Sequence, residues 1–155
     1  MLAIFVDGDA CPVKDEVYVV ATRYGVPVAL VANAPIFVPA GFGVQLIVVD
    51  EGPDAADDWI AEHVHAGDVV VTADIPLAAR CLAKQARVLG NDGRAFSEDS
   101  IGGLLATRAL KSDLRDAGVT TRGPRPLGAK ERSLFAQRLD ELVQRGMREA
   151  GAGSG

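Results

Sequence analysis

The feature that most constrains the fold of this chain is a set of short apolar runs that end at polar or acidic residues. The first run, Leu2 to Val6, is followed at once by Asp7. A continuous apolar run of this length, bounded by a turn, is typical of a strand buried on both faces of a parallel sheet. Pro12 suits the first turn of a helix. The start of the chain therefore predicts a strand, an acidic turn and a helix.

Further apolar runs repeat this arrangement. Strands are predicted at residues 26–32, 44–49, 69–72 and 87–89, and helices at residues 12–24, 54–64, 76–85, 97–117 and 130–148. The run at 69–72 repeats the first unit most closely, because Asp74 and Pro76 follow it. Strands that alternate with helices build a parallel sheet covered on both sides. We expect a single α/β domain over residues 1–150 and a disordered tail over residues 151–155.

Length and composition agree with one domain. The chain has 155 residues, 48% of them hydrophobic, which is enough for a buried core without disulfides. Cys11 and Cys81 lie far apart without metal-binding spacing, and Cys11 is expected to be a packing residue. The N-terminal apolar run is too short for a secretory leader, and no run approaches the length of a membrane span. These features predict a cytoplasmic protein without membrane contact, and they leave a homo-oligomer open.

Polar side chains follow several of the predicted strands. Asp7 and Asp9 follow the first strand, Asn33 follows the second and Asp74 follows the fourth. In open parallel sheets, ligands bind in the crevice at the carboxyl ends of the strands. Gly8 keeps the first of these turns narrow and open to a ligand. The acidic residues are therefore expected at the edge of the sheet where a site forms.

A second group of acids opens the predicted helix at 54–64. Asp54 is well placed as its N-cap, and Asp57 and Asp58 lie in its first turn. Carboxylates at such positions often have a structural role, because they cap the helix or offset its dipole. Position alone leaves both the structural and the functional interpretation open.

Clustered carboxylates would point to a metal ion. Several carboxylates brought together from separate strand ends repel one another unless a cation lies among them. Hard divalent cations such as Mg²⁺ and Mn²⁺ prefer oxygen ligands, and at such sites they promote hydrolysis of phosphodiester bonds. On this hypothesis Asp7, Asp9, Asp57 and Asp74 hold the ion or position the attacking water.

The charge of the chain is unevenly distributed. Residues 1–105 contain six Lys or Arg against fifteen Asp or Glu, whereas residues 106–155 contain ten against six. A basic segment beside an acidic site would attract a polyanion such as RNA, although ordinary solvated helix faces give the same counts. Arg122 and Arg125, in a Gly/Pro-rich segment, are the strongest candidates for backbone contacts.

Four other residues are candidate substrate contacts. Lys14 lies one turn into the first helix and Arg80 lies on the helix after Asp74, so that each could reach a phosphate. Asn33 and Thr72 face the same crevice from the ends of two strands. For Lys14 and Arg80, pairing with a carboxylate or simple solvation is the alternative.

Several longer motifs carry a resemblance to a known family. They are residues 7–14 (Asp-Gly-Asp-Ala-Cys-Pro-Val-Lys), 54–57 leading to Ile60-Ala61, 67–78, 92–94, and the late Arg132, Phe135 and Leu139. Together they resemble the YaiI/YqxD family of bacterial proteins, which is grouped with the PIN-like nucleases, over nearly the whole chain. The resemblance implies a three-layer α/β/α domain with a mainly parallel five-stranded sheet in the order 3-2-1-4-5.

The resemblance also implies a metal-dependent acidic site. In PIN-like nucleases one acid follows the first strand, one lies on a mid-chain helix, and one or two follow the fourth strand. The matching positions here are Asp7, Asp57 and Asp74, with Asp9 and Asp54 as further metal ligands. The implied activity is hydrolysis of phosphodiester bonds of RNA with Mg²⁺ or Mn²⁺, although likeness of fold does not by itself carry function.

Two other functions start from the same residues. Asp7-Gly8-Asp9 resembles the opening of haloacid-dehalogenase-like phosphatases, in which the first Asp is the nucleophile and the second a general acid, with Thr72 in place of their second motif. Alternatively, the chain is a non-catalytic RNA-binding module that keeps the acids for Mg²⁺ or for structure. Turnover of RNA distinguishes these functions from a nuclease.

Overall fold

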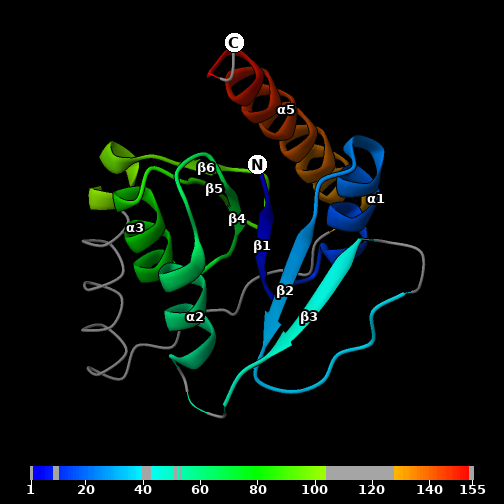
Figure 1. The fold of residues 1–155 in the computed structure, drawn as a ribbon, viewed down its shortest axis with the longest axis vertical. Coiled ribbons are helices and arrows are strands. Elements are labelled where there is room, and N and C mark those ends of the chain that lie inside the picture. Colours follow the sequence, from blue (N-terminus) through cyan, green and yellow to red (C-terminus); the bar gives the residue numbers. More distant parts are fainter. Residues whose placement is uncertain are drawn as a thin grey trace.

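The computed structural model describes residues 2–8, 11–39, 43–50, 52, 54–103 and 128–153, without the side chains of 150–153. One six-stranded sheet has the order β3-β2-β1-β4-β5-β6 (Figure 1). Its strands are β1 (Ile4–Asp7), β2 (Val28–Ala32), β3 (Val44–Val48), β4 (Val69–Val71), β5 (Arg87–Leu89) and β6 (Ala95–Phe96). The first five pair in parallel, and β6 pairs antiparallel with β5. The predicted α/β class and strand order are confirmed, and β6 is added to the five predicted strands.

The described helices are α1 (Lys14–Tyr24), α2 (Ala55–His63), α3 (Ile75–Ala83) and α5 (Ala129–Gly153), with a further helical segment at residues 98–103. Helix α1 ends as predicted at Gly25, whose φ of 65° is left-handed. Helix α5 continues to Gly153, five residues beyond the predicted end and into the segment expected to be a tail. The rest of the helix predicted at 97–117 lies outside the described residues.

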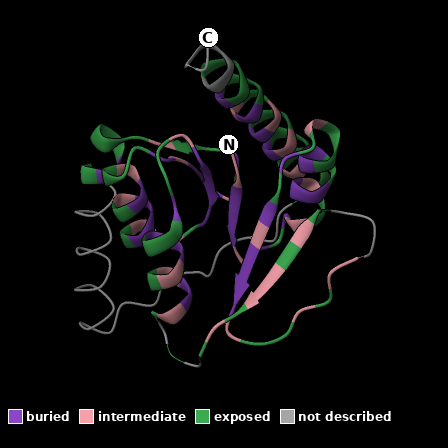
Figure 2. Ribbon diagram, in the orientation of Figure 1, coloured by how far each residue is buried: buried purple, intermediate pink, exposed green. Residues whose placement is uncertain are grey.

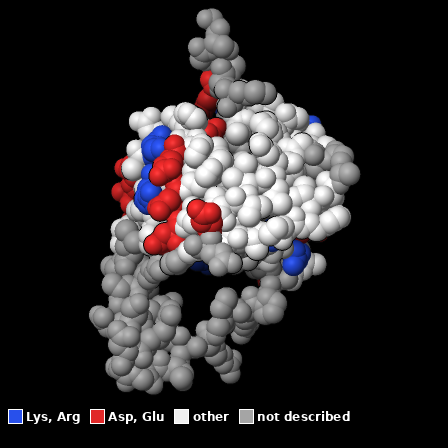
Figure 3. All heavy atoms as spheres, turned by 60° about the horizontal axis from the view of Figure 1, so that its bottom comes forward, with Lys and Arg blue, Asp and Glu red and all other residues white. Residues whose placement is uncertain are grey.

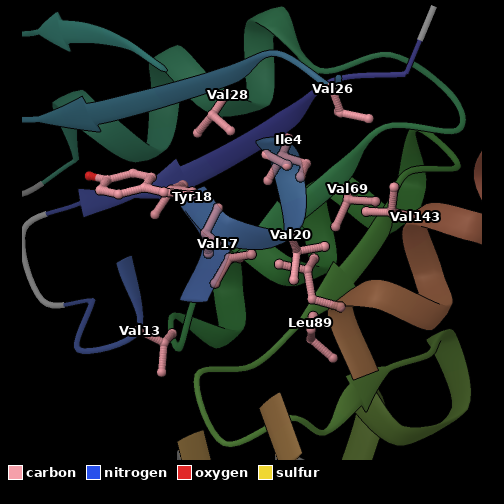
Figure 4. Close-up of a cluster of buried hydrophobic side chains, with 14 of the residues drawn as sticks. Ile4, Val13, Val17, Tyr18, Val20, Val26, Val28, Val69, Leu89 and Val143 are labelled. Atoms are coloured by element: carbon pink, nitrogen blue, oxygen red, sulfur yellow. The ribbon is translucent and has the colours of Figure 1, made fainter. Parts of the chain in front are cut away.

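One face of the sheet is covered by α1 and α5. Side chains alternate along a strand, so Ile4 and Val6 of β1 point to this face. Val17 of α1 lies in one hydrophobic cluster with Ile4 (Figure 4). Leu139 of α5 belongs to the same cluster, and Val17 and Leu139 are both fully buried. Burying one such side chain contributes about 1.5–3 kcal/mol. The last helix of the chain is thereby part of the main core.

The opposite face is covered by α2 and α3. Phe5, between the two β1 residues that face α1, points to this side and packs with Ile60 of α2 and Leu77 of α3. The buried residues of both faces meet at the central strands β1 and β4, and exposed residues lie on the outer helix surfaces (Figure 2). Helices on both faces of the sheet give the predicted three layers.

The topology brings three connections to one edge. The carboxyl ends of the parallel strands lie at the lower edge in Figure 1, where α1, α2 and α3 begin. Asp68 lies at the opposite end of β4, where its buried carboxylate accepts hydrogen bonds from the backbone N–H of Ala3 at 3.1 Å and of His65 at 2.8 Å. The carboxyl edge is therefore where the sequence-predicted site must be sought.

Candidate active site

Thr72 joins the two central acidic turns. Its hydroxyl donates to Asp7 Oδ2 at 3.1 Å and accepts a hydrogen bond from the backbone N–H of Asp74 at 3.0 Å. Thr72 is buried and lies directly after β4, the strand that pairs with β1. The side chain predicted to contact a substrate therefore holds the turns after β1 and β4 against each other.

Asp74 has a structural role that the strand-end argument did not include. It is the N-cap of α3, and its Oδ1 accepts a hydrogen bond from the backbone N–H of Leu77 at 2.9 Å. Pro76 follows in the first turn of the helix, where a missing N–H costs nothing. The sequence signal that could have revealed this cap is an Asp followed two residues later by Pro.

Asp57 faces the other acids from the first turn of α2. Burial and, next in size, the charges of Asp74, Asp7 and Asp54 raise the pKa of its carboxyl to about 6. Arg80 opposes this rise in pKa. A response of Asp57 to these three carboxylates means that acids from β1, α2 and the β4–α3 turn lie within electrostatic range of one another.

The expectation that Asp54 caps α2 with its side chain is wrong. Asp54 occupies the N-cap position with φ −110° and ψ 0°, outside the extended region typical of a capping residue, and its side chain makes no capping hydrogen bond. Its backbone carbonyl instead accepts the N–H of Asp58 at 2.8 Å. The exposed Asp54 carboxylate therefore adds negative charge to the edge without capping the helix.

Three other predicted substrate contacts already have partners within the protein. Arg80 forms an exposed ion pair with Asp58 at 2.8 Å, which was the alternative role considered for it. Lys14 Nζ donates to the carbonyl of Cys11 at 3.0 Å. Asn33 Nδ2 donates to the carbonyl of Asp50 at 3.0 Å and so ties the chain after β3 to the end of β2. These contacts hold the turns around the acids, and a substrate would have to compete with them.

Cys11 is buried, and burial raises the pKa of its thiol. This agrees with a packing residue, because a reactive cysteine needs a lowered pKa. The neighbouring turn is held by Arg132 of α5, whose guanidinium donates to the carbonyl of Pro12 and lies 3.5 Å from Glu16 Oε1. No local pattern in the sequence signals a contact between residues this far apart, so the sequence analysis missed it.

The donor atoms fit a hard cation in kind. Asp7, Asp57 and Asp74 present carboxylate oxygens, which Mg²⁺ and Mn²⁺ prefer. In their described positions, no group of three or more His, Cys, Asp or Glu residues is arranged to hold a metal ion. Like charges that repel one another stay apart, and this repulsion adds to burial in raising the pKa of Asp57. The site thus contains the type of ligand atoms that a divalent cation binds, but its carboxylates lie too far from one another to hold an ion in these positions.

Acidic side chains gather on this edge of the molecule. Figure 3 turns the lower edge of Figure 1 toward the viewer and shows them beside a smaller basic group. Asp9, Arg122 and Arg125 lie outside the described residues, so their predicted roles stay predictions.

Comparison with known proteins identifies the family. The family described as uncharacterized BCR, YaiI/YqxD family matches residues 5–145. The chain belongs to the YaiI/YqxD family. A UPF0178 protein of Rhodopseudomonas palustris is 54% identical over 142 residues, covering 92% of this chain and 87% of that protein. A UPF0178 protein of Paramagnetospirillum magneticum is 51% identical over 148 residues, covering 96% and 98% respectively. No solved structure matches the chain significantly.

The YaiI/YqxD motifs named from the sequence correspond to the parts of this site. Residues 7–14 contain the turn after β1, and residues 67–78 contain β4, Thr72 and the start of α3. The late motif places Arg132 against the first turn and Phe135 beside Gly93, where an added Cβ would lie 3.3 Å from the Phe135 Cα. Within the described residues, no helix combines the length and apolar character needed to cross a membrane.

Proposed function

We propose that this YaiI/YqxD family member is a PIN-like nuclease that hydrolyses phosphodiester bonds of RNA with Mg²⁺ or Mn²⁺. The observation that carries the proposal is the convergence of carboxylates from β1, α2 and the β4–α3 turn on one edge, with Thr72 joining Asp7 to the Asp74 turn. Acids placed together at a cost in electrostatic repulsion are characteristic of functional sites.

Asp7, Asp57 and Asp74 would hold the ion, with Asp54 as an additional ligand from the same edge and Asp9, two residues after Asp7 in the sequence, as another. Asp74 would contribute Oδ2, because its Oδ1 caps α3. When bound, a divalent cation supplies the positive charge that offsets a phosphate and favours attack by water. Thr72 keeps the Asp7 carboxylate oriented through its hydroxyl, a contact that a substrate does not need to displace.

Asp57 is the best placed group to accept a proton. Burial and the charges of Asp74, Asp7 and Asp54 raise the pKa of its carboxyl to about 6 in the protein without metal, and a bound cation would lower it again. A carboxylate beside the ion is in position to act as a general base. We therefore assign the proton of the attacking water to the Asp57 carboxylate oxygen that does not contact the ion.

RNA as the substrate follows from charge. The N-terminal two thirds of the chain is strongly acidic, so a polyanion can approach only if basic residues offset the repulsion. Residues 106–155 contain ten Lys or Arg, including Arg122 and Arg125, and these side chains can supply the positive charge that RNA requires. Phosphate contacts release counterions, so RNA affinity should fall steeply with salt.

The test compares Asp57→Asn with Glu62→Gln, which removes an exposed carboxylate from the last turn of the same helix. Cleavage of single-stranded RNA is measured with Mn²⁺, and Mn²⁺ affinity by calorimetry. The proposal predicts that Asp57→Asn loses at least about 100-fold in rate, the lower range for a general base, and that it binds Mn²⁺ more weakly, while Glu62→Gln matches the wild type. Equal loss in both variants would contradict it.

Two further assays separate the alternatives. Hydrolysis of a phosphate monoester that depends on Asp7, without cleavage of RNA, would support the phosphatase. Binding of RNA without turnover under every divalent ion tested would support the binding module. Salt dependence of that binding, measured for wild type and for the Arg122→Ala, Arg125→Ala double variant with Ca²⁺ present, locates the backbone contacts: the double variant should flatten the slope by nearly two for duplex RNA.

A further inference from the structure

The strand β3 forms one edge of the sheet with its backbone polar groups directed outward. The carbonyl of Gly43 accepts the N–H of Val28, and the N–H of Val49 donates to Ala32, so odd-numbered residues bond to β2. Backbone direction alternates along a strand, and the N–H and C=O groups of Val44, Leu46 and Val48 therefore point away from the sheet. Among the described residues, these groups have no backbone hydrogen-bond partner.

This edge lacks the devices that normally prevent strand pairing. Exposed edge strands usually carry Lys, Pro, a bulge or an inward-pointing charge, or are very short. The sequence of β3 is Val-Gln-Leu-Ile-Val, with no charge and no proline, and Val48 is 49% exposed. The opposite edge, β6, has only two residues. The sequence of β3 itself thus carries none of these protective features, whereas β6 is protected by its shortness.

The chain before β3 does not occupy these groups in the described part. Residues 34–39 run on the outer side of β3 in Figure 1, yet they make no backbone hydrogen bond to it. Val38, Val44 and Leu46 each pack against the buried cluster on the α1 face. Residues 34–39 therefore leave the outward N–H and C=O groups of β3 available to another strand.

We propose that β3 pairs antiparallel with β3 of a second copy of this chain, about a two-fold axis at Leu46. Only registers that oppose outward-directed residues make hydrogen bonds. If the two-fold axis passes through Leu46, Leu46 pairs with Leu46 of the second strand and Val44 pairs with Val48, so that all three outward residues of each strand form hydrogen bonds. If the axis passes through Gln45 or Ile47, only two outward residues of each strand pair, and the N–H and C=O of the third have no partner.

The side chains of this pairing are compatible with a second copy. Val44, Leu46 and Val48 lie on one face of the strand, and in the proposed register they adjoin their own counterparts on the same face. Cross-strand contacts between β-branched and apolar side chains are favourable, and no like charges face each other. A strand that is complementary to itself needs no foreign partner, and C2 dimers are the commonest oligomers. The dimer joins two sheets into one and is independent of the proposed nuclease activity.

Cysteine cross-linking tests the register directly. Hydrogen-bonded residues in an antiparallel pair have Cα atoms about 5.5 Å apart, within the reach of a disulfide. Leu46→Cys should therefore cross-link to itself under mild oxidation. Gln45→Cys, on the same strand, should not, because in this register its own counterpart lies too far away. The native Cys11 and Cys81 are both buried and leave the assay clean.

Sedimentation tests the dimer without cross-linking. Val48→Pro removes an outward N–H that the monomer does not use, and proline is tolerated at such an edge. Wild type should show a monomer–dimer equilibrium, and both Val48→Pro and Val48→Lys should shift it to monomer at unchanged melting temperature in dilute solution. Val19→Lys, at a half-exposed valine of α1, should leave it unchanged. Wild type that sediments as a monomer up to about 1 mM, or Leu46→Cys that cross-links no faster than Gln45→Cys, would overturn the proposal.

Discussion

The two acidic turns that resemble each other in sequence differ in what their acids do. Both follow a central strand and lead to a proline and a helix. In the turn after β4, Asp74 caps its own helix through Leu77. In the turn after β1, the N-cap of α1 is Val13, which makes no side-chain capping bond, and Asp7 contacts the other turn through Thr72. Asp74 thus stabilises the start of a helix, whereas Asp7 lies at the end of a strand and contacts the neighbouring turn.

The small residues of the two turns differ in the same way. Gly8 is buried against β2, and a Cβ there would lie 2.8 Å from Leu30 Cδ1 and 3.0 Å from the carbonyl oxygen of Val31. Ala73, in the other turn, is exposed and carries its Cβ without a clash. The first turn is thus shaped by close approach to a neighbouring strand, and the second by helix capping. This comparison makes predictions that differ between the turns.

The largest effect is expected at Gly8. Gly8→Ala places a Cβ against a backbone oxygen that cannot move without disturbing β2, so we expect a loss of about 1–3 kcal/mol in the free energy of unfolding. Ala73→Gly, the matched change in the other turn, should cost about 0.5 kcal/mol or less, as surface changes do. Urea denaturation of both variants measures this. Equal losses would show that the two turns are packed alike.

A smaller effect is expected from removal of the Asp74 cap. Asp74→Ala leaves the N–H of Leu77 without its partner and should lower the free energy of unfolding by about 0.5–2 kcal/mol. Asp74→Asn keeps an acceptor at a position where Asn caps as well as Asp, so its stability should stay near that of the wild type. Thermal melts of Asp74→Ala and Asp74→Asn in EDTA separate the capping role of Asp74 from the effect of its charge. If Asp74→Asn is as destabilising as Asp74→Ala, the capping role is contradicted.

From apolar runs bounded by turns, the sequence predicted five of the six strands. Its resemblance to the YaiI/YqxD family implied their order. The sequence was not sufficient for side-chain partners. Asp54 and Asp74 both precede a helix with capping chemistry, yet only Asp74 makes the bond, because capping depends on the backbone angles at the N-cap.

Long-range contacts were beyond reach for a different reason. The sequence shows Arg132 as one of several basic residues on a helix, and only the packing of α5 on α1 brings it to Pro12. The two-residue strand β6 is too short to show any periodicity, so the sequence gives no sign of it. Chemistry that depends on neighbours in space has no local signature.

The acids of both turns also act on Asp57, and pH reveals this. The pKa of Asp57 is about 6 in the folded protein against an ordinary value of 3.8, so the folded state binds its proton more tightly than the unfolded state does. Its contribution to stability is therefore full below pH 3.8 and is lost as the pH rises to about 6. Asp140 has the opposite slope, because a hydrogen bond from Tyr24 and the Arg23 charge lower its pKa.

The measurement therefore compares the free energies of unfolding of Asp57→Asn and the wild type at each pH. The free energy of unfolding of Asp57→Asn minus that of the wild type should rise as the pH increases from about 4 to 6, in EDTA and at low salt, because only the wild type loses the contribution of Asp57. A flat curve for Asp57→Asn would mean that neither burial nor the acids of the two turns raise the pKa of Asp57 in the folded protein.

The smallest effect in stability, and the most specific, is expected at Asp7. Asp7→Asn keeps an oxygen that can accept the Thr72 hydroxyl and removes one of the charges that act on Asp57. The protein without metal should be as stable as the wild type or slightly more stable, within about 0.5 kcal/mol, because one repulsion is gone and one hydrogen bond stays. The pKa of Asp57, followed by NMR of its carboxyl carbon, should fall toward 3.8, and Asp74→Asn should lower it further, since the Asp74 charge is the larger of the two influences. Mn²⁺ affinity should weaken in both variants even though stability is kept. An Asp57 pKa that stays near 6 in both Asp7→Asn and Asp74→Asn would show that the acids of the two turns do not raise it, and they would then have no reason to share a cation.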